Sequence, residues 1–184
     1  YSEVLKYALI NDINFFKILK KNEKKILKMQ TAFLENIIAK CCKAKANIVV
    51  QDEKESNKRM LLNLGHTFAH AIEAELNFKI RHGEAVALGL LMALKLSFLK
   101  KKINNNDFVS VQKHLRKMKL PTSLKEISNR KIWSATSLIK KMQKDKKINK
   151  NKLRFILCNG IGSAYISSSI VEKKIVETIK EFSQ

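Results

Sequence analysis

Residues 59–84 read RMLLNLGHTFAHAIEAELNFKIRHGE, and three of the four histidines of the chain fall within them. The polar side chains of the first half recur every three or four residues: Arg59, Asn63, His66 and His70. This spacing predicts that they lie on one face of a helix. Because buried polar and charged groups cost free energy unless they are paired, the stripe indicates a site for an anion and a metal.

Most of the remaining sequence also has helical periodicity. The segment 84–99, EAVALGLLMALKLSFL, is apolar nearly all round, which predicts the central buried helix of the domain. The chain has only five Gly and one Pro, which favours long helices over a fold with many turns. Further helices are expected at 2–20 (with a break or bend at 11–12), 24–43, 60–76, 108–118, 132–143 and 169–182, with a short one after Pro121.

Two short segments near the C-terminus predict β structure. Residues 153–157 and 164–166 flank the turn sequence NGIGS, as in a β-hairpin. A brief β-like stretch is also expected at 46–50, and Asp107 is expected to cap the helix at 108–118. The predicted fold class is therefore mainly α, with about eight helices and one small β-hairpin near the C-terminus.

Length and composition describe a single domain. A chain of 184 residues without an internal repeat or linker can bury one core, so we expect one helical domain over residues 1–184. It begins without Met directly in a helical pattern, from which we expect a piece of a longer protein. Three cysteines without CxxC spacing indicate a reducing cytoplasm. No membrane span is expected, because no apolar run reaches about 18 residues without a charge.

The formal net charge of +21 raises the possibility of nucleic-acid binding. Only five of the 37 basic residues are Arg, however, and the Lys residues are spread along the whole chain among Asn and Ile. Proteins that read bases and phosphates use the fork of Arg more than scattered Lys. We therefore interpret most of the charge as solvated surface and predict no nucleic-acid partner.

The spacing of His66 and His70 suits two ligands of one metal, but it also suits two hydrogen-bonded core histidines. His82, in the sequence HGE at the start of the next helix, can fold back toward this pair, with Gly83 allowing close backbone approach. From spacing alone the ligand set stays open. Glu3 and Lys6, one turn apart, read as an ordinary surface ion pair.

Several segments together resemble one enzyme family. The run DEKESNKRMLLNLGHTFAHAIEAEL, continued by RHGEAVALGLLMA, is similar to the signature of the 3-dehydroquinate synthases. The segments SEVLKYALINDINFF, CCKAKANIVVQDE, KLPTSL and MQKDKKINKNKLRFILCNGIGSA resemble other parts of the family pattern in the same order. The resemblance covers nearly the whole chain and implies the C-terminal, multi-helical domain of that fold.

The resemblance also implies roles for individual residues. Glu3, His66 and His82 match the ligands of a divalent metal, with Zn2+ expected and Co2+ possible. His70 matches a histidine of the substrate pocket instead of a ligand, which changes the reading of the HxxxH pair. The other matched substrate-binding residues are Lys6, Lys45, Arg59, Asn63 and one lysine of the DKK motif, for which Lys146 is preferred over Lys147. Lys6, Lys45 and His70 are the expected catalytic residues.

The implied reaction converts 3-deoxy-D-arabino-heptulosonate 7-phosphate to 3-dehydroquinate and phosphate, a step of the shikimate pathway. NAD is reduced and reoxidised within one turnover, so the implied enzyme class is a lyase. Family members bind NAD in an N-terminal α/β domain, and nothing in this chain resembles it. We therefore expect a homodimeric cytoplasmic enzyme of which this chain is the metal and substrate half, inactive alone.

Two other interpretations are weighed against this one. Another sugar-phosphate cyclase of the same fold would share most of these motifs and differ in its substrate. A basic helical domain that binds nucleic acid would account for the charge, but it leaves the histidines and Asn63 unexplained. Metal-dependent alcohol or glycerol dehydrogenases lack the complete motif set and rank low. An inactive remnant is disfavoured because every implied ligand is present.

Overall fold

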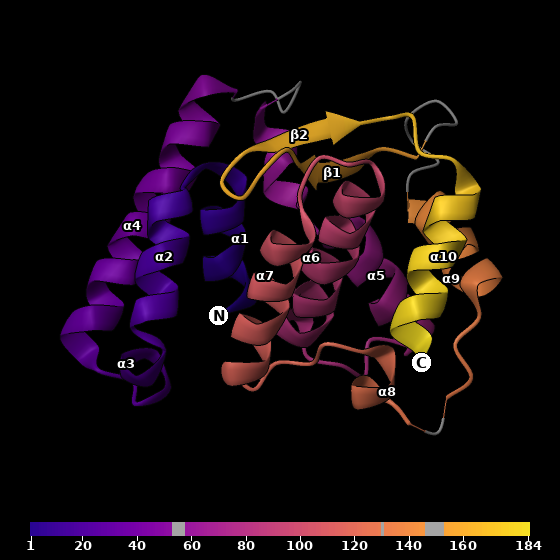
Figure 1. Ribbon diagram of the computed structural model, residues 1–184, viewed down its shortest axis with the longest axis horizontal. Coiled ribbons are helices and arrows are strands. Elements are labelled where there is room, and N and C mark those ends of the chain that lie inside the picture. The colour runs from indigo at the N-terminus through magenta and orange to yellow at the C-terminus, as the bar shows by residue number, and fades with distance from the viewer. Residues whose placement is uncertain (53–57, 130, 146–152) are drawn as a thin grey trace.

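The helices of the chain surround one long apolar helix, α6 (His82–Leu99) (Figure 1). The computed structural model describes residues 1–52, 58–129, 131–145 and 153–184. The other described elements are α1 (Ser2–Asn11), α2 (Ile13–Lys21), α3 (Glu23–Leu27), α4 (Thr31–Gln51), η1 (Lys58–Asn63, a 3-10 helix), α5 (His66–Glu75), α7 (Asn105–Lys117), α8 (Leu124–Ile127), α9 (Ala135–Asp145), β1 (Phe155–Cys158), β2 (Ala164–Ser167) and α10 (Glu172–Ser183). The predicted mainly α class is confirmed.

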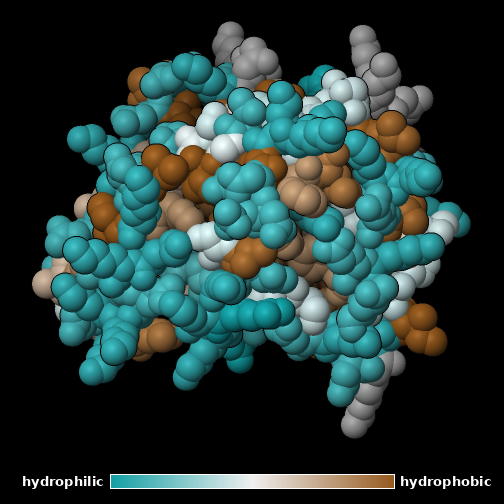
Figure 2. All heavy atoms as spheres, viewed as in Figure 1, coloured by the Kyte–Doolittle hydropathy of each residue, from teal (hydrophilic) through white to brown (hydrophobic). Residues whose placement is uncertain are grey.

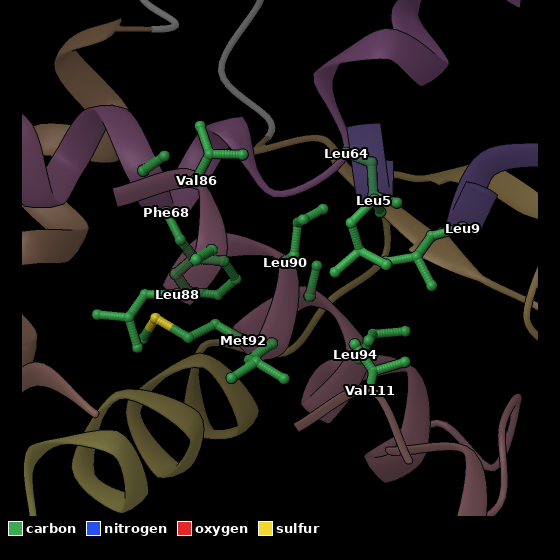
Figure 3. Packing of buried hydrophobic residues seen from close by; sticks show 14 of the residues in the cluster. Leu5, Leu9, Leu64, Phe68, Val86, Leu88, Leu90, Met92, Leu94 and Val111 are labelled. Carbon is green, nitrogen blue, oxygen red and sulfur yellow. The ribbon is translucent and has the colours of Figure 1, made fainter. Parts of the chain in front are cut away.

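Helix α6 forms the centre of the core, as its composition predicts. Every residue from Ala85 to Leu94 is buried. In Figure 3 Leu90 lies beside Leu5 and Leu64, while Leu88 and Met92 lie near Phe68. The helix is long and apolar enough to cross a membrane by those two criteria, yet 67% of it is buried inside the protein. That burial is what a core helix of this composition requires.

The crossing of α5 and α6 is unusually close because glycines face each other. A Cβ on Gly89 would lie 2.2 Å from the carbonyl oxygen of Gly65, and one on Gly65 would lie 2.7 Å from the backbone nitrogen of Leu90. Gly65 also has φ +81°, a conformation that L side chains rarely adopt. Gly83, by contrast, has only the Ser2 Oγ near its Cβ position, at 3.8 Å, so the prediction that it permits close approach is wrong.

Some predicted elements differ from the structure. Residues 46–50 continue helix α4 instead of forming a β-like stretch. The left-handed Gly65 divides the predicted helix 60–76 into η1 and α5. Asn104, and not Asp107, caps α7, because the Asn104 side chain accepts the backbone N–H of Asp107 at 2.8 Å. Asp12 ends α1 and caps α2 through Phe15, which confirms the predicted break.

The predicted hairpin is present as the antiparallel pair β1–β2, with Phe155 opposite Ser167 and Cys158 opposite Ala164. It runs across the upper ends of the helices in Figure 1. Its loop is joined to α1 and to the connection that follows α6, since Gly162 N–H donates to the Leu9 carbonyl and Gly160 N–H to the Lys102 carbonyl. The hairpin therefore contacts the end of α1 and the connection after α6, on the side away from both chain termini (Figure 1).

Hydrophilic side chains cover most of the face drawn in Figure 2, with smaller hydrophobic areas between them. On that face the hydrophilic residues are spread over many elements instead of gathering on one. This distribution agrees with the interpretation of the lysines as a solvated surface.

Candidate metal centre

Three side chains from three helices converge at one point of the structure. Glu3 comes from the first turn of α1, His66 is the first residue of α5 and His82 the first of α6. Glu3 Oε1 lies 3.3 Å from His66 Nε2 and 3.5 Å from His82 Nε2. The three candidate ligand atoms all lie within 4.8 Å of one another.

The far nitrogen of each imidazole has a partner that accepts a hydrogen. His66 Nδ1 lies 3.1 Å from the Leu64 carbonyl oxygen, and His82 Nδ1 lies 2.8 Å from Glu73 Oε1. In a neutral imidazole only one nitrogen carries hydrogen, so these contacts assign it to Nδ1. The Nε2 lone pairs of both rings then face the carboxylate of Glu3.

The charge of Glu3 is fixed by its neighbours. Burial by itself raises the pKa of this carboxyl, but two neighbours outweigh it and lower the pKa to about 2: His66, which acts when its ring is protonated, and Lys6. Glu3 is therefore an anion at neutral pH. Among the described residues no hydrogen bond reaches its buried Oε1 atom. A carboxylate oxygen and two imidazole lone pairs that face one another without a shared hydrogen call for a cation between them.

The distances suit a small divalent ion. Ligands about 2.0–2.1 Å from Zn2+ at tetrahedral angles lie roughly 3.4 Å apart. The two measured Glu3 to imidazole distances, 3.3 and 3.5 Å, are close to that value. Three protein ligands leave the fourth position open, which is the arrangement of catalytic zinc sites. Two imidazoles and one carboxylate also suit Co2+.

Two predicted substrate residues lie directly beside these ligands. Lys6 Nζ forms an ion pair with Glu3 Oε2 at 2.6 Å, and Lys6 is only 5% exposed. The interpretation of Glu3 and Lys6 as a surface ion pair is therefore wrong. The His70 ring meets the His66 ring edge to face, with centroids 5.5 Å apart. His70 is exposed, so it can face solvent or a bound molecule next to the cluster.

The remaining predicted residues lie on neighbouring elements. Lys45 is exposed on α4, and Arg59 and Asn63 belong to η1, which packs against both α4 and α1. In a 3-10 helix residues four apart do not share a face, so the predicted stripe from Arg59 to His70 is wrong as a single helical face. Among the described residues neither Lys45 nor Asn63 forms a hydrogen bond or ion pair with the three candidate ligands. Lys146 and Lys147 lie outside the described residues.

A family model described as 3-dehydroquinate synthase C-terminal matches residues 1–148. The chain belongs to this family. A 3-dehydroquinate synthase from Pelagibacter ubique is 40% identical over 177 residues, and one from Bradyrhizobium diazoefficiens is 41% identical over 186 residues. The alignments cover 95% and 98% of this chain but 48% of each relative. The chain thus spans about half the length of the curated relatives it matches.

Solved structures similar in fold to this domain include two synthases of other names. The 2-epi-5-epi-valiolone synthase from Streptomyces hygroscopicus, solved with NAD+ and Zn2+, has a TM-score of 0.85 at 18% identity, over 98% of this chain and 49% of that one. A 2-deoxy-scyllo-inosose synthase solved with carbaglucose-6-phosphate, NAD+ and Co2+ has a TM-score of 0.77 at 23% identity, over 98% and 51%. At identities below 25%, the similarity to these two structures establishes only the fold of this member of the 3-dehydroquinate synthase family.

Sequence reasoning missed one side chain of the centre of this family member, Glu73. It follows His66 by seven residues, or two helical turns, and so lies on the ligand face of α5. The signal in the sequence was a carboxylate within the largely apolar run FAHAIEAEL, where a buried charge needs a partner. Its partner, His82, could not be found from spacing because it belongs to another helix.

Proposed function

We propose that this chain is the metal- and substrate-binding part of a 3-dehydroquinate synthase. The activity would convert 3-deoxy-D-arabino-heptulosonate 7-phosphate to 3-dehydroquinate and phosphate, as a phosphate-eliminating lyase that uses NAD within each turnover. The observation that carries this proposal is the convergence of Glu3, His66 and His82, with Lys6 and His70 beside them. Family membership and relatives of this name support it.

In this proposal the residues divide the work by their chemistry. Glu3, His66 and His82 would hold the divalent metal, which when bound supplies Lewis acidity to a substrate hydroxyl. Lys6 and Arg59 present cations for the carboxylate and phosphate of a doubly anionic substrate. His70, exposed beside His66, can accept and return a proton at a hydroxyl bound next to it.

Three further assignments belong to the same proposal. Lys45 and Asn63 would complete the substrate contacts, and Lys146 would bind the phosphate group. NAD would be bound mainly by the other half of the full-length protein, because the chain spans about half of its relatives. That half and a second copy in a homodimer are the proposed protein partners.

Metal analysis of the intact protein tests the site. The wild type is expected to hold about one Zn2+ or Co2+ per chain, and His66→Ala and His82→Ala each to lose most of it, because each removes one of three protein ligands. His114→Gln serves as the control, since it removes a histidine that lies outside the cluster. Full metal content in both ligand variants would show that the site is wrong.

A second candidate function is another sugar-phosphate cyclase activity, which the likeness to the valiolone and inosose synthases favours. Phosphate release by the intact protein separates the two candidates. The heptulosonate 7-phosphate is expected to be consumed, while glucose 6-phosphate and sedoheptulose 7-phosphate are not. Turnover of either alternative substrate at a higher kcat/KM would favour the second candidate.

A further inference from the structure

Glu73 is a buried carboxylate that holds the most exposed of the three candidate ligands. Its side chain is 12% exposed, whereas that of His82 is 51% exposed, and the two meet with Oε1 2.8 Å from Nδ1. The contact bridges two helices, since Glu73 lies in α5 and His82 begins α6. An imidazole that is half in solvent would otherwise be free to rotate and to change tautomer.

The backbone of Glu73 also shapes the approach to His82. Its carbonyl oxygen accepts the N–H of Phe78 at 2.7 Å and that of Leu76 at 3.2 Å, at the turn that leaves α5. Asn77 and Phe78 both have positive φ there, so the turn has a defined path. The same residue thus holds the connection to α6 by its backbone and the first side chain of α6 by its carboxylate.

We propose that Glu73 is a positioning residue for the metal centre. Its carboxylate keeps hydrogen on Nδ1 of His82, directs Nε2 toward Glu3 and His66, and through its negative charge makes Nε2 a stronger ligand. Carboxylates that contact metal-bound histidines in this way change metal affinity by roughly 10–100-fold. This inference rests on the proposed metal site, and it adds a residue that contacts neither metal nor substrate.

The Nδ1 atoms of the two imidazoles have partners of different charge. His66 Nδ1 contacts a neutral carbonyl, that of Leu64, while His82 Nδ1 contacts a charged group. Loss of Glu73 should therefore act only through His82. A bond that merely fastened α5 to α6 would lower stability and leave the metal affinity of the folded protein unchanged.

The experiment measures the dissociation constant of Zn2+ for the intact protein by competition with a chromophoric chelator. Glu73→Leu is expected to weaken binding by about 10–100-fold. Glu73→Gln is expected to weaken it less, because the amide oxygen still accepts the Nδ1 hydrogen but carries no charge. Glu73→Gln is also nearly isosteric, so it remains informative if the leucine variant folds poorly.

Glu75→Gln is the matched control from the same helix. Glu75 is also a poorly exposed carboxylate, with a side chain 10% exposed, but it binds Lys131, Lys141 and the Ser137 hydroxyl. This variant should lose stability and keep the Zn2+ dissociation constant of the wild type. Equal weakening in Glu75→Gln and Glu73→Gln would overturn the proposal.

A double-mutant cycle with His82→Ala tests the route of the effect. In that background Glu73→Leu is expected to leave the residual Zn2+ affinity unchanged, and a further loss of similar size would overturn the proposal. The outcome is separate from that of the activity assay. If the Zn2+ results are as expected but no sugar phosphate is turned over, the proposed function fails while the role of Glu73 stands.

Discussion

At the scale of single residues, the fourth histidine has a different environment from the other three. His114 is fully buried in a hydrogen-bonded chain, with Nε2 2.7 Å from the Tyr1 hydroxyl and Nδ1 2.7 Å from Glu23 Oε1. Lys117 Nζ meets the other oxygen of Glu23 at 3.0 Å. This series of hydrogen bonds connects Tyr1, which precedes α1, with α3 and α7. It therefore holds together helices that are far apart in the sequence.

Burial lowers the pKa of His114 below its usual 6.5, and Lys20 and Lys117 act in the same direction, while Glu23 opposes them. Burial raises the pKa of Glu23, but His114 and Lys117 outweigh it and lower that pKa below 4.5. At pH 7 neutral His114 therefore donates a hydrogen bond from Nδ1–H to the ionised Glu23. Its Nε2 accepts a hydrogen bond from the Tyr1 hydroxyl.

This arrangement predicts a pH-dependent contribution to stability. A depressed histidine pKa stabilises the fold above about pH 6.5, and the contribution is lost as the pH falls through the folded pKa. His114→Gln should lower the free energy of unfolding by about 1–3 kcal/mol at pH 7, because Tyr1 and Glu23 lose partners. Urea unfolding of the metal-free proteins should show a smaller difference from wild type at pH 5. A difference that stays constant or grows would contradict this account.

At the scale of elements, the α5–α6 crossing decides where the ligands meet. The two helices approach closely at Gly65 and Gly89, and the first residue of each is a candidate ligand, His66 or His82. Small residues at a helix crossing allow the backbones to approach, and a methyl group added there must displace one of them. Packing at one point of the crossing thus sets the spacing of the metal centre.

Two glycines of the same helix allow a matched test of this crossing. Gly89→Ala is expected to lower the free energy of unfolding by about 1–3 kcal/mol or more, because the new Cβ would meet the Gly65 carbonyl oxygen. Gly83→Ala should be neutral or stabilise by up to about 1 kcal/mol, since alanine favours the helix and its Cβ has room. Urea unfolding compares them, and equal effects would show that the crossing tolerates the methyl group.

At the scale of the whole molecule, the chain spans about half the length of each of its two relatives described above. Its candidate ligands come from the first turns of α1, α5 and α6, so a bound ion would link three helices of the core at one point. Ions that bind only the folded state stabilise it by about 2.7 kcal/mol at 100 times their dissociation constant.

We therefore predict that residues 1–184 alone bind Zn2+ without catalysing the reaction. Zinc should raise the Tm of the isolated chain, and His66→Ala should remove that increase. Phosphate release with NAD+ and Zn2+ should be undetectable, because the proposed NAD site lies in the other half of the protein. Turnover by the isolated chain would contradict the division of labour proposed above.

Local sequence patterns predict the fold class, and the family resemblance predicts which residues are the candidate ligands. The continuous apolar run of α6 predicts burial on all sides, and the turn sequence NGIGS between two short β-like segments predicts a hairpin. Resemblance to the family then selected Glu3, His66 and His82 from the acidic residues and histidines of the chain. These are properties of local pattern and motif, which a linear sequence carries directly.

The arrangement of those residues in space depends on how the helices pack against one another. The split of 60–76 at Gly65 and the continuation of α4 through 46–50 depend on packing that local propensity does not describe. The burial of Lys6 and the contact between Glu73 and His82 arise because α1, α5 and α6 meet in space. The spacing along one helix is compatible with a metal site formed by His66 and His70. In the structure, packing between helices places His66 and His82 next to Glu3.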